Sequence, residues 1–360
     1  MNIDNFVEDV KKCRFCFMCR HLSGVANVSF READTPRIRS SMVWGVMLDN
    51  SKLANSDFID TIYSSDMSAA CRFHCVNKWD ENGIVLAARR DIVEAGLAPA
   101  EVAKLAKKLA ATPAAPKISG KAELLYYADS DTAALATESA AFEKLAKAAG
   151  VKFAAASEGN CGKALKVLGY ADDAKKKLSE FVEALNASGA KKIVVSSPYV
   201  YDALVNDAAE CGLKLSAKVM HVSEFAATAK IRYAKKAGAV YYLESDYLKN
   251  YNDNLKFPRA LLAKIKAKSP QEFTTDIQET PIDFMFGTNN EESYTCGEGA
   301  VVLNIIRPEL VRKMAKYVES KADDVKNDVI AVASPYTKIQ LAKNTKLKVL
   351  TLAELAAQCL

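Results

Sequence analysis

The sequence lacks any run of 18 apolar residues, and its first residues, MNIDNFVEDVKKC, carry acidic charge and no apolar core of signal length. A transmembrane helix needs about 20 largely apolar residues in succession, and a secretory signal needs an apolar core behind basic residues. We therefore expect neither a transmembrane segment nor a secretory signal. The predicted location is the cytoplasm, with any membrane association made through a partner.

A large excess of charge of one sign is also missing. The 49 basic residues nearly balance the 44 acidic ones, which leaves a net charge of +5 on 360 residues. Proteins that bind nucleic acid usually concentrate basic charge on one surface, so no nucleic-acid partner is expected. Half of the residues are apolar. A chain of this length and composition can bury a core in each of two or three domains.

The organisation along the chain changes near residue 111. Residues 1–110 show helix-like apolar spacing and contain five of the nine cysteines, which predicts an all-helical domain. Residues 111–121, ATPAAPKISGK, are interpreted as a linker because proline cannot continue a helix. Beyond them, short β-branched or aromatic runs alternate with Ala/Lys-rich helical patterns. This alternation is typical of a parallel sheet with crossover helices, so the predicted fold class is α/β with a helical head.

The α/β region repeats itself, which predicts two open lobes at 122–232 and 237–360. Strand-like segments of the first are 122–129, 151–158, 191–198 and 218–225, and those of the second are 239–246, 283–289, 328–335 and 347–355. A Cys-Gly turn recurs at Cys161 and Cys296, and a Ser-Pro-Tyr turn recurs at Ser197 and Ser334. Because repeated strand-helix units use the same right-handed crossovers, we expect these turns to face one shared crevice.

Three cysteines lie in one short run, CRFCFMC, at Cys13, Cys16 and Cys19. In a reducing compartment, clustered cysteines serve metals or redox chemistry more often than disulfides. The C-x2-C-x2-C spacing lets three thiolates from one loop reach three corners of a cubane iron-sulfur cluster, which needs a fourth ligand.

The fourth ligand follows from the pattern of two-cluster ferredoxins, in which the last cysteine of each run ligates the other cluster. Ser23 stands at that place in the first run, and a second run keeps only Cys71 and Cys75. The crossing rule therefore assigns one 4Fe-4S cluster to Cys13, Cys16, Cys19 and Cys75. The second set would consist of Ser65, Ser68, Cys71 and Ser23. Serine is a poor ligand for a soft metal, so this second set is interpreted as dismantled.

Zinc is an alternative, because it accepts the same thiolates and could take His21 or His74 as its fourth ligand. Structural zinc sites usually combine separated C-x2-C pairs, whereas this sequence has a triple run, which favours iron and sulfur. Cys71 has a simpler interpretation as a small buried hydrophobic residue.

The sequence resembles the iron-sulfur subunits of the CCG-domain family, which include the heterodisulfide reductase catalytic subunit and iron-sulfur subunits of glycolate or lactate oxidase systems. Besides the cysteines, the segments that carry the resemblance are 35–39, 75–99, 160–170, 194–204, 257–265, 295–300 and 349–356. It implies an electron-transfer subunit of a redox complex. Its one 4Fe-4S cluster would pass electrons to or from a partner, either a flavin-dependent dehydrogenase subunit or another iron-sulfur protein.

The departures from the family pattern limit what the resemblance implies. In the family, each lobe can assemble cysteines that hold a non-cubane cluster. In this sequence the corresponding positions of the first lobe are Ser130, Asn160, Cys161, Ser197 and Val200, and those of the second lobe are Asp246, Thr295, Cys296, Ser334 and Thr337. One thiolate per lobe cannot hold a multi-iron cluster, so no non-cubane cluster is expected and no catalytic residue is assigned. A structural or assembly subunit with a non-redox cluster is the alternative, and a disulfide- or thiol-active reductase is less favoured.

Overall fold

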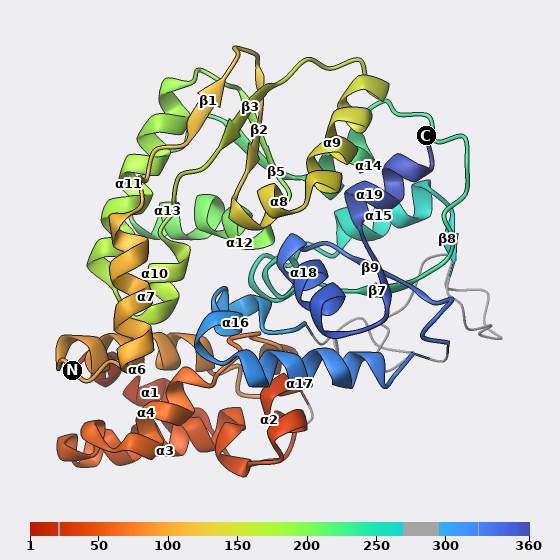
Figure 1. The fold of residues 1–360 in the computed structure, drawn as a ribbon. Coiled ribbons are helices and arrows are strands. Elements are labelled where there is room, and N and C mark those ends of the chain that lie inside the picture. Colours follow the sequence, from red (N-terminus) through yellow and green to blue (C-terminus); the bar gives the residue numbers. More distant parts are fainter. Residues whose placement is uncertain (21, 269–294, 323) are drawn as a thin grey trace.

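The structure is a computed structural model that describes residues 1–20, 22–268, 295–322 and 324–360, and it has a mixed α/β fold (Figure 1). The described elements of the first 111 residues are all helical. They are η1 (Asn2–Phe6), α1 (Val7–Lys12), α2 (Gly24–Ser29), η2 (Glu32–Asp34), α3 (Pro36–Leu48), η3 (Asn50–Ala54), α4 (Ser56–Tyr63), α5 (Cys71–His74), α6 (Glu81–Glu94) and α7 (Ala100–Ala111). We refer to residues 1–111 as the head, which lies at the bottom of Figure 1.

The first sheet has five strands in the order β1-β3-β2-β4-β5. They are β1 (Lys117–Ser119), β2 (Leu124–Ala128), β3 (Ala154–Ser157), β4 (Lys192–Val195) and β5 (Lys218–His221). All neighbouring strands run parallel except β1, which pairs antiparallel with β3. Strand β1 falls inside the segment interpreted as a linker, so this segment also extends the sheet.

Helices follow the strands of the first sheet as crossover connections require. They are α8 (Ser130–Ala134), α9 (Ala136–Ala148), α10 (Lys163–Leu168), α11 (Ala171–Ala187), α12 (Pro198–Asp202), the π-helix η4 (Ala203–Asp207), α13 (Ala208–Glu210) and α14 (Val222–Thr228). Strand β2 is buried along its whole length. Leu124 and Tyr126 pack into one apolar cluster and Leu125 and Tyr127 into the other, because successive side chains of a strand point to opposite faces. The sheet therefore separates two buried cores.

The second sheet has three described strands, in the order β10-β9-β7, all parallel. They are β7 (Tyr241–Leu243), β9 (Val329–Val332) and β10 (Lys348–Thr351). The predicted strand at 283–289 lies outside the described residues. The order β7-β9-β10 is the same as the order β2-β4-β5 of the first sheet. Two very short strands, β6 (Gly238–Ala239) and β8 (Ala267–Lys268), form a separate pair.

The second sheet has its own helices. They are the π-helix η5 (Asp246–Tyr251), α15 (Lys256–Lys264), η6 (Glu298–Ala300), α16 (Leu303–Ile306), α17 (Pro308–Glu319), α18 (Pro335–Asn344) and α19 (Leu352–Gln358). Helix α19 packs against α9 of the first sheet, and α17 packs against α2 of the head (Figure 1). None of the described helices combines the length and apolar character that a membrane crossing requires.

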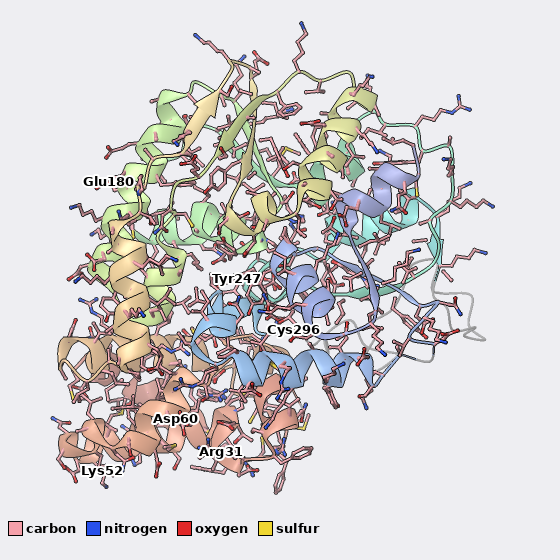
Figure 2. All side chains as sticks on the ribbon, viewed as in Figure 1. Arg31, Lys52, Asp60, Glu180, Tyr247 and Cys296 are labelled. Atoms are coloured by element: carbon pink, nitrogen blue, oxygen red, sulfur yellow. The ribbon has the colours of Figure 1, made fainter. Side chains whose placement is uncertain are left out.

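Polar contacts fix the head on the two sheet units. The Arg89 guanidinium donates to the carbonyl oxygens of Ile62 (2.9 Å) in the head and Val167 (2.8 Å) beside the first sheet. On the other side, Arg307 bonds to Asp60 (3.0 Å), which Figure 2 places at the junction with the second unit. Arg89 is fully buried, so these bonds to carbonyl oxygens hold the backbone of both partners in place.

Candidate metal centre

The loop between α1 and α2 carries three of the four predicted ligands. Cys13 is the C-cap of α1 and has an extended backbone, so the helix ends where the cysteine run begins. Phe15 has a left-handed backbone (φ 53°), which is unusual for a residue with a Cβ and turns the chain tightly between the cysteines. Cys16 is exposed, Cys13 is half-buried and Cys19 is buried. The three thiols therefore lie at increasing depth from surface to core.

Cys75 reaches the same place from a distant part of the chain. It is the C-cap of α5, where its amide donates to the carbonyl oxygen of Cys71 (2.9 Å). Two residues later, Asn77 Nδ2 donates to the carbonyl oxygen of Lys12 (2.8 Å), the residue that precedes Cys13. This bond ties the Cys75 loop to the start of the cysteine run.

The thiols of the run interact electrostatically with each other and with Cys75. Burial raises the pKa of Cys13, a backbone N–H of Phe15 hydrogen-bonded to the thiol opposes this rise, and the nearby Cys75 and Cys16 thiols add to it. Burial raises the pKa of Cys19 to about 11, opposed by the backbone N–H of Arg37 and reinforced by Glu81 and by Cys13 and Cys16. All four predicted ligands therefore belong to one neighbourhood, and the raised pKa values of Cys13 and Cys19 keep these two thiols protonated at neutral pH.

The donor set bears differently on zinc and on an iron-sulfur cluster. Within the described residues, no three Cys, His, Asp or Glu side chains converge closely enough to hold a single metal ion. Tetrahedral zinc with Zn–S distances of about 2.3 Å brings its sulfurs within about 4 Å of one another. A cubane binds each thiolate at a separate iron corner, so its sulfur ligands can lie farther apart than those of a single zinc ion. The four cysteines supply the sulfur donors that a cubane needs, and they lie in one neighbourhood. Two of them, Cys13 and Cys19, also accept hydrogen bonds from backbone N–H groups. His21 and the His74 side chain lie outside the described parts.

The second, serine-containing set occupies a hydrogen-bonded network. Ser23 Oγ caps α2 by accepting from the Ala26 amide (3.2 Å) and donates to the carbonyl oxygen of Asp34 (2.9 Å). Arg39 donates to the same oxygen (2.7 Å).

A buried ion pair completes this network. The Arg39 guanidinium lies 2.6 Å from Glu81 Oε1, and the other carboxylate oxygen of Glu81 lies 4.0 Å from Cys71 Sγ. Burial, reinforced by Glu81, raises the pKa of Cys71 well above its usual value. Cys71 is therefore a buried, protonated thiol held beside an ion pair, which agrees with its interpretation as a structural residue.

The loop that precedes Cys71 is held by the second sheet unit. Asn250 Nδ2 donates to the carbonyl oxygen of Ser68 (2.6 Å), and the Tyr251 hydroxyl donates to that of Met67 (2.6 Å). Gly299 approaches the same loop so closely that a Cβ there would lie 2.2 Å from the Met67 oxygen. Gly299, in the segment 295–300, is thus required for contact between the head and the second unit.

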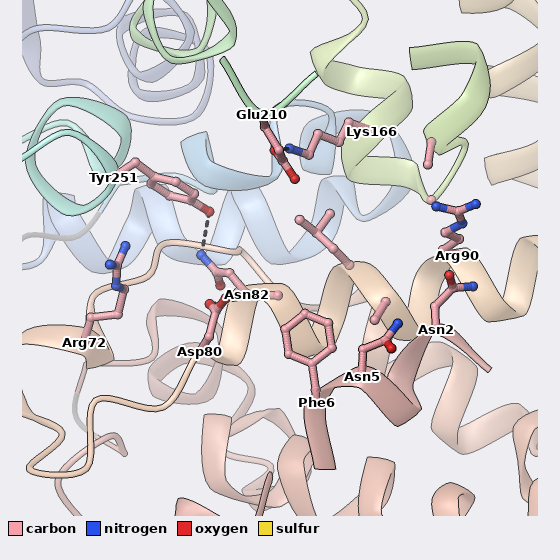
Figure 3. Close-up of a pocket in the computed structure, with 15 residues that line it drawn as sticks. Asn2, Asn5, Phe6, Arg72, Asp80, Asn82, Arg90, Lys166, Glu210 and Tyr251 are labelled. Atoms are coloured by element: carbon pink, nitrogen blue, oxygen red, sulfur yellow. Dashed lines mark hydrogen bonds and ion pairs between the residues drawn. The ribbon is translucent and has the colours of Figure 1, made fainter. Parts of the chain in front are cut away.

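A cavity of about 440 Å³ lies beside this junction, between η1 and α6 of the head and α10 (Figure 3). Arg72 and Asp80, which flank Cys75 in sequence, both line it, and Asn82 donates to the Tyr251 hydroxyl (2.5 Å) across it. The segment around Cys75 therefore borders a cavity whose other walls come from the head and from both sheet units.

The lone cysteines of the sheet units are buried. Burial raises the pKa of Cys161 to about 12 and raises that of Cys296 further from its usual value. Cys296 is fully buried inside the second unit (Figure 2). The Tyr336 hydroxyl donates to the Cys296 carbonyl oxygen (3.1 Å). Neither cysteine has the depressed pKa and partial exposure of a reactive thiol.

The ends of the parallel strands of the first sheet border a cavity of about 380 Å³. It is lined mainly by residues of the first unit, with Leu109 of the head and with Val301, Val302, Asn304 and Ile305 of the second unit. Ser197 and Tyr199 both donate to Asp129 in its wall, at 2.6 and 2.5 Å. The Ser-Pro-Tyr turn thus makes polar contacts with a carboxylate at the position where metal ligation would require cysteine.

Sequence reasoning did not identify Arg37, Arg39, Glu81 or Asn77 as members of the centre. The first two lie in the segment TPRIR, which contributed only to the family resemblance. A comparison with protein-family models and with curated proteins gave no match for this chain.

Proposed function

We propose that the chain is an iron-sulfur electron-transfer subunit of a redox complex, with one 4Fe-4S cluster on Cys13, Cys16, Cys19 and Cys75. The observation that carries the proposal is the meeting of the C-x2-C-x2-C loop with Cys75. The hydrogen bond from Asn77 to the Lys12 carbonyl oxygen (2.8 Å) holds the two segments together. Burial chiefly raises the pKa of Cys13, and the nearby Cys75 thiol adds to this rise. A triple run plus one remote cysteine is the ligand pattern of a cubane.

The cluster would supply reversible single-electron transfer, and the chain's own groups would hold and tune it. Backbone N–H groups of Phe15 and Arg37 hydrogen-bond to the Cys13 and Cys19 sulfurs, respectively. Hydrogen bonds to the sulfurs and nearby positive charge favour the more negative, reduced state of such a centre. The Arg37 side chain also donates to the Phe15 carbonyl oxygen (3.1 Å), so one residue supports the loop from two sides.

An exposed apolar surface surrounds the proposed centre and supports a protein partner there. Phe17 is 74% exposed and Val76 is 86% exposed, and Phe15 and Met18 are exposed as well. These four residues neighbour the proposed ligands in sequence. Apolar and aromatic side chains that gather at one exposed place mark interaction surfaces. A partner that covers them would come within electron-transfer distance of the cluster.

The class of partner rests on the family resemblance. It favours a flavin-dependent dehydrogenase subunit, another iron-sulfur protein, or both, in the cytoplasm. The same resemblance makes the head an α-helical ferredoxin-like domain and the two sheet units repeated CCG-like lobes. The shared strand order of β2-β4-β5 and β7-β9-β10 supports the repeat.

The second candidate is a structural or assembly subunit whose cluster only holds the head together. It is favoured by the contacts that Asn250, Tyr251 and Gly299 make with the head, because these would preserve a shape without any chemistry. A thiol-active enzyme ranks below both, because Cys161 and Cys296 are buried with raised pKa values.

The test is a redox titration of the anaerobically purified full chain, followed by low-temperature electron spin resonance. Reversible uptake of one electron per chain supports electron transfer. A cluster that stays redox-silent across the physiological range of potential supports the structural role. Turnover of a disulfide substrate by the chain alone would overturn both in favour of the thiol enzyme. Cys211→Ala is the matched control for the ligand variant Cys16→Ala, since Cys211 lies far along the chain at the end of α13.

A further inference from the structure

A third cavity, of about 720 Å³, lies at the opposite end of the first sheet from the Cys161 turn. It is formed at the amino ends of β2 and β4, where α9 and α14 end, in the upper part of Figure 1 and away from the head. It shares no lining residue with the metal centre or with the cavity between the sheet units. Neither the proposed cluster nor the cavity beside Cys161 accounts for it.

The floor of this cavity is apolar. Leu124, Met220 and Phe225 line it and are themselves almost fully buried, and Val151 lies beside them with three alanines of the surrounding segments. A volume between about 300 and 1,000 Å³ with an apolar lining is typical of sites for small organic molecules. The floor therefore suits an aliphatic or aromatic body.

The rim carries charge of one sign. The basic residues that line the cavity are Lys121, Lys152, Lys191, Lys192 and Lys230, and the only carboxylate among the lining residues is Glu123. Glu123 pairs with Lys191 at 2.5 Å. Of the carboxylates that the structure describes, none lies within ion-pair distance of the other four lysines. Glu123 also interacts electrostatically with Lys192, so Lys121, Lys152 and Lys230 are the rim lysines that lack an acidic partner among the described residues.

The fold explains only part of this charge. Lys152 and Lys230 follow the carboxyl ends of α9 and α14, where the partial negative charge of the helix favours a cation. Lys121 precedes β2 and Lys192 is the first residue of β4, so neither stands at a helix end. Like charges around one low-dielectric cavity repel each other, and an anion bound among them removes that repulsion.

We propose that this cavity binds a small organic anion that has an apolar body, with a carboxylate or phosphate head among the lysines and an aliphatic or aromatic part on the floor. The lysine rim supplies the attraction for the head and the site's dependence on ionic strength. The floor supplies the selectivity for an apolar body over inorganic phosphate. The site is independent of the cluster, so it exists whether or not the centre transfers electrons.

Isothermal titration of the full, cluster-loaded chain tests this with probes of equal length, namely octanoate, octyl phosphate and octanol. We expect one anion per chain and binding of octanol at least about tenfold weaker. From butanoate to octanoate, each added methylene should raise affinity about three- to fourfold. Whichever of octanoate and octyl phosphate binds more tightly identifies the preferred head group. Equal binding of octanol, or no binding of either anion, would overturn the proposal.

The variant that tests the rim is Lys152→Glu combined with Lys192→Glu. Its matched control is Lys175→Glu combined with Lys176→Glu, which makes the same charge change at two exposed positions of α11. We expect at least about tenfold weaker octanoate binding in the rim variant and less than twofold change in the control. Equal affinities in the two variants would show that the lysines of the rim do not hold the anion.

Discussion

Replacing Cys71 and Cys75 one at a time separates a structural thiol from a ligand. Cys71 is 3% exposed, and its sulfur lies 4.0 Å from Glu81 Oε2. In Cys71→Ala, Glu81 keeps its ion pair with Arg39 (2.6 Å), so no buried charge loses its partner. The substitution therefore removes only one methylene-sized group, the sulfur, from a packed site. We expect this to lower the free energy of unfolding by about 1 kcal/mol. We expect the cluster to remain.

Cys75→Ala has the opposite effect. The Cys75 side chain is half-buried, so its truncation removes little packing, but it removes one of four proposed iron ligands. Iron per chain, measured by colorimetric assay after anaerobic purification, should stay near about four in Cys71→Ala and fall below about one in Cys75→Ala. Anaerobic urea titration of each variant gives the accompanying change in stability. An iron-free Cys71→Ala protein together with an iron-replete Cys75→Ala protein would refute the crossing assignment.

Three further predictions concern charge. Glu81→Ala should destabilise the chain by about 3–5 kcal/mol in urea titration because it leaves the Arg39 cation buried without its partner, while the double variant Arg39→Met/Glu81→Leu should lose far less; equal losses would contradict the buried-pair account. Burial raises the pKa of Glu138 from 4.5 to about 7, so the folded state holds a proton that the unfolded state has already released. The free energy of unfolding should therefore fall as pH rises from about 4.5 to about 7, and this fall should be smaller in Glu138→Gln. An equal dependence on pH in the two proteins would contradict the raised pKa of Glu138. Because burial raises the pKa values of Cys13 and Cys19, cluster loading should release protons in weakly buffered solution, and loading without proton release would disprove the protonated thiols.

The α/β class was predictable because the strands of the buried sheets are short β-branched or aromatic runs. Predicted segments 122–129 and 191–198 contain β2 and β4, and 328–335 contains β9. The prediction of a strand at 218–225 is correct only for its first half, which is β5. Its strand ends at His221, whose Nδ1 accepts from the Ser223 amide (3.2 Å) and caps α14. A local capping bond thus ended a strand that the apolar pattern alone would have extended.

Long-range contacts could not be predicted from the sequence. Strand β1 was missed inside a proline-rich segment, because it exists only through its pairing with β3. The spacing of the cysteines identified the candidate ligands. It could not indicate that Asn77 would reach Lys12 or that Arg39 and Glu81 would pair beside Cys71, since partners so far apart in sequence meet only in the folded chain.

Anomalous scattering at the iron edge, from crystals grown without oxygen, tests the central claim most directly. The proposal predicts one group of iron density per chain, bounded by Cys13, Cys16, Cys19 and Cys75, and none beside Cys161 or Cys296. A zinc edge signal in place of iron at the four cysteines would contradict the cluster. Iron beside Cys161 or Cys296 would contradict the division of roles and make the sheet units catalytic.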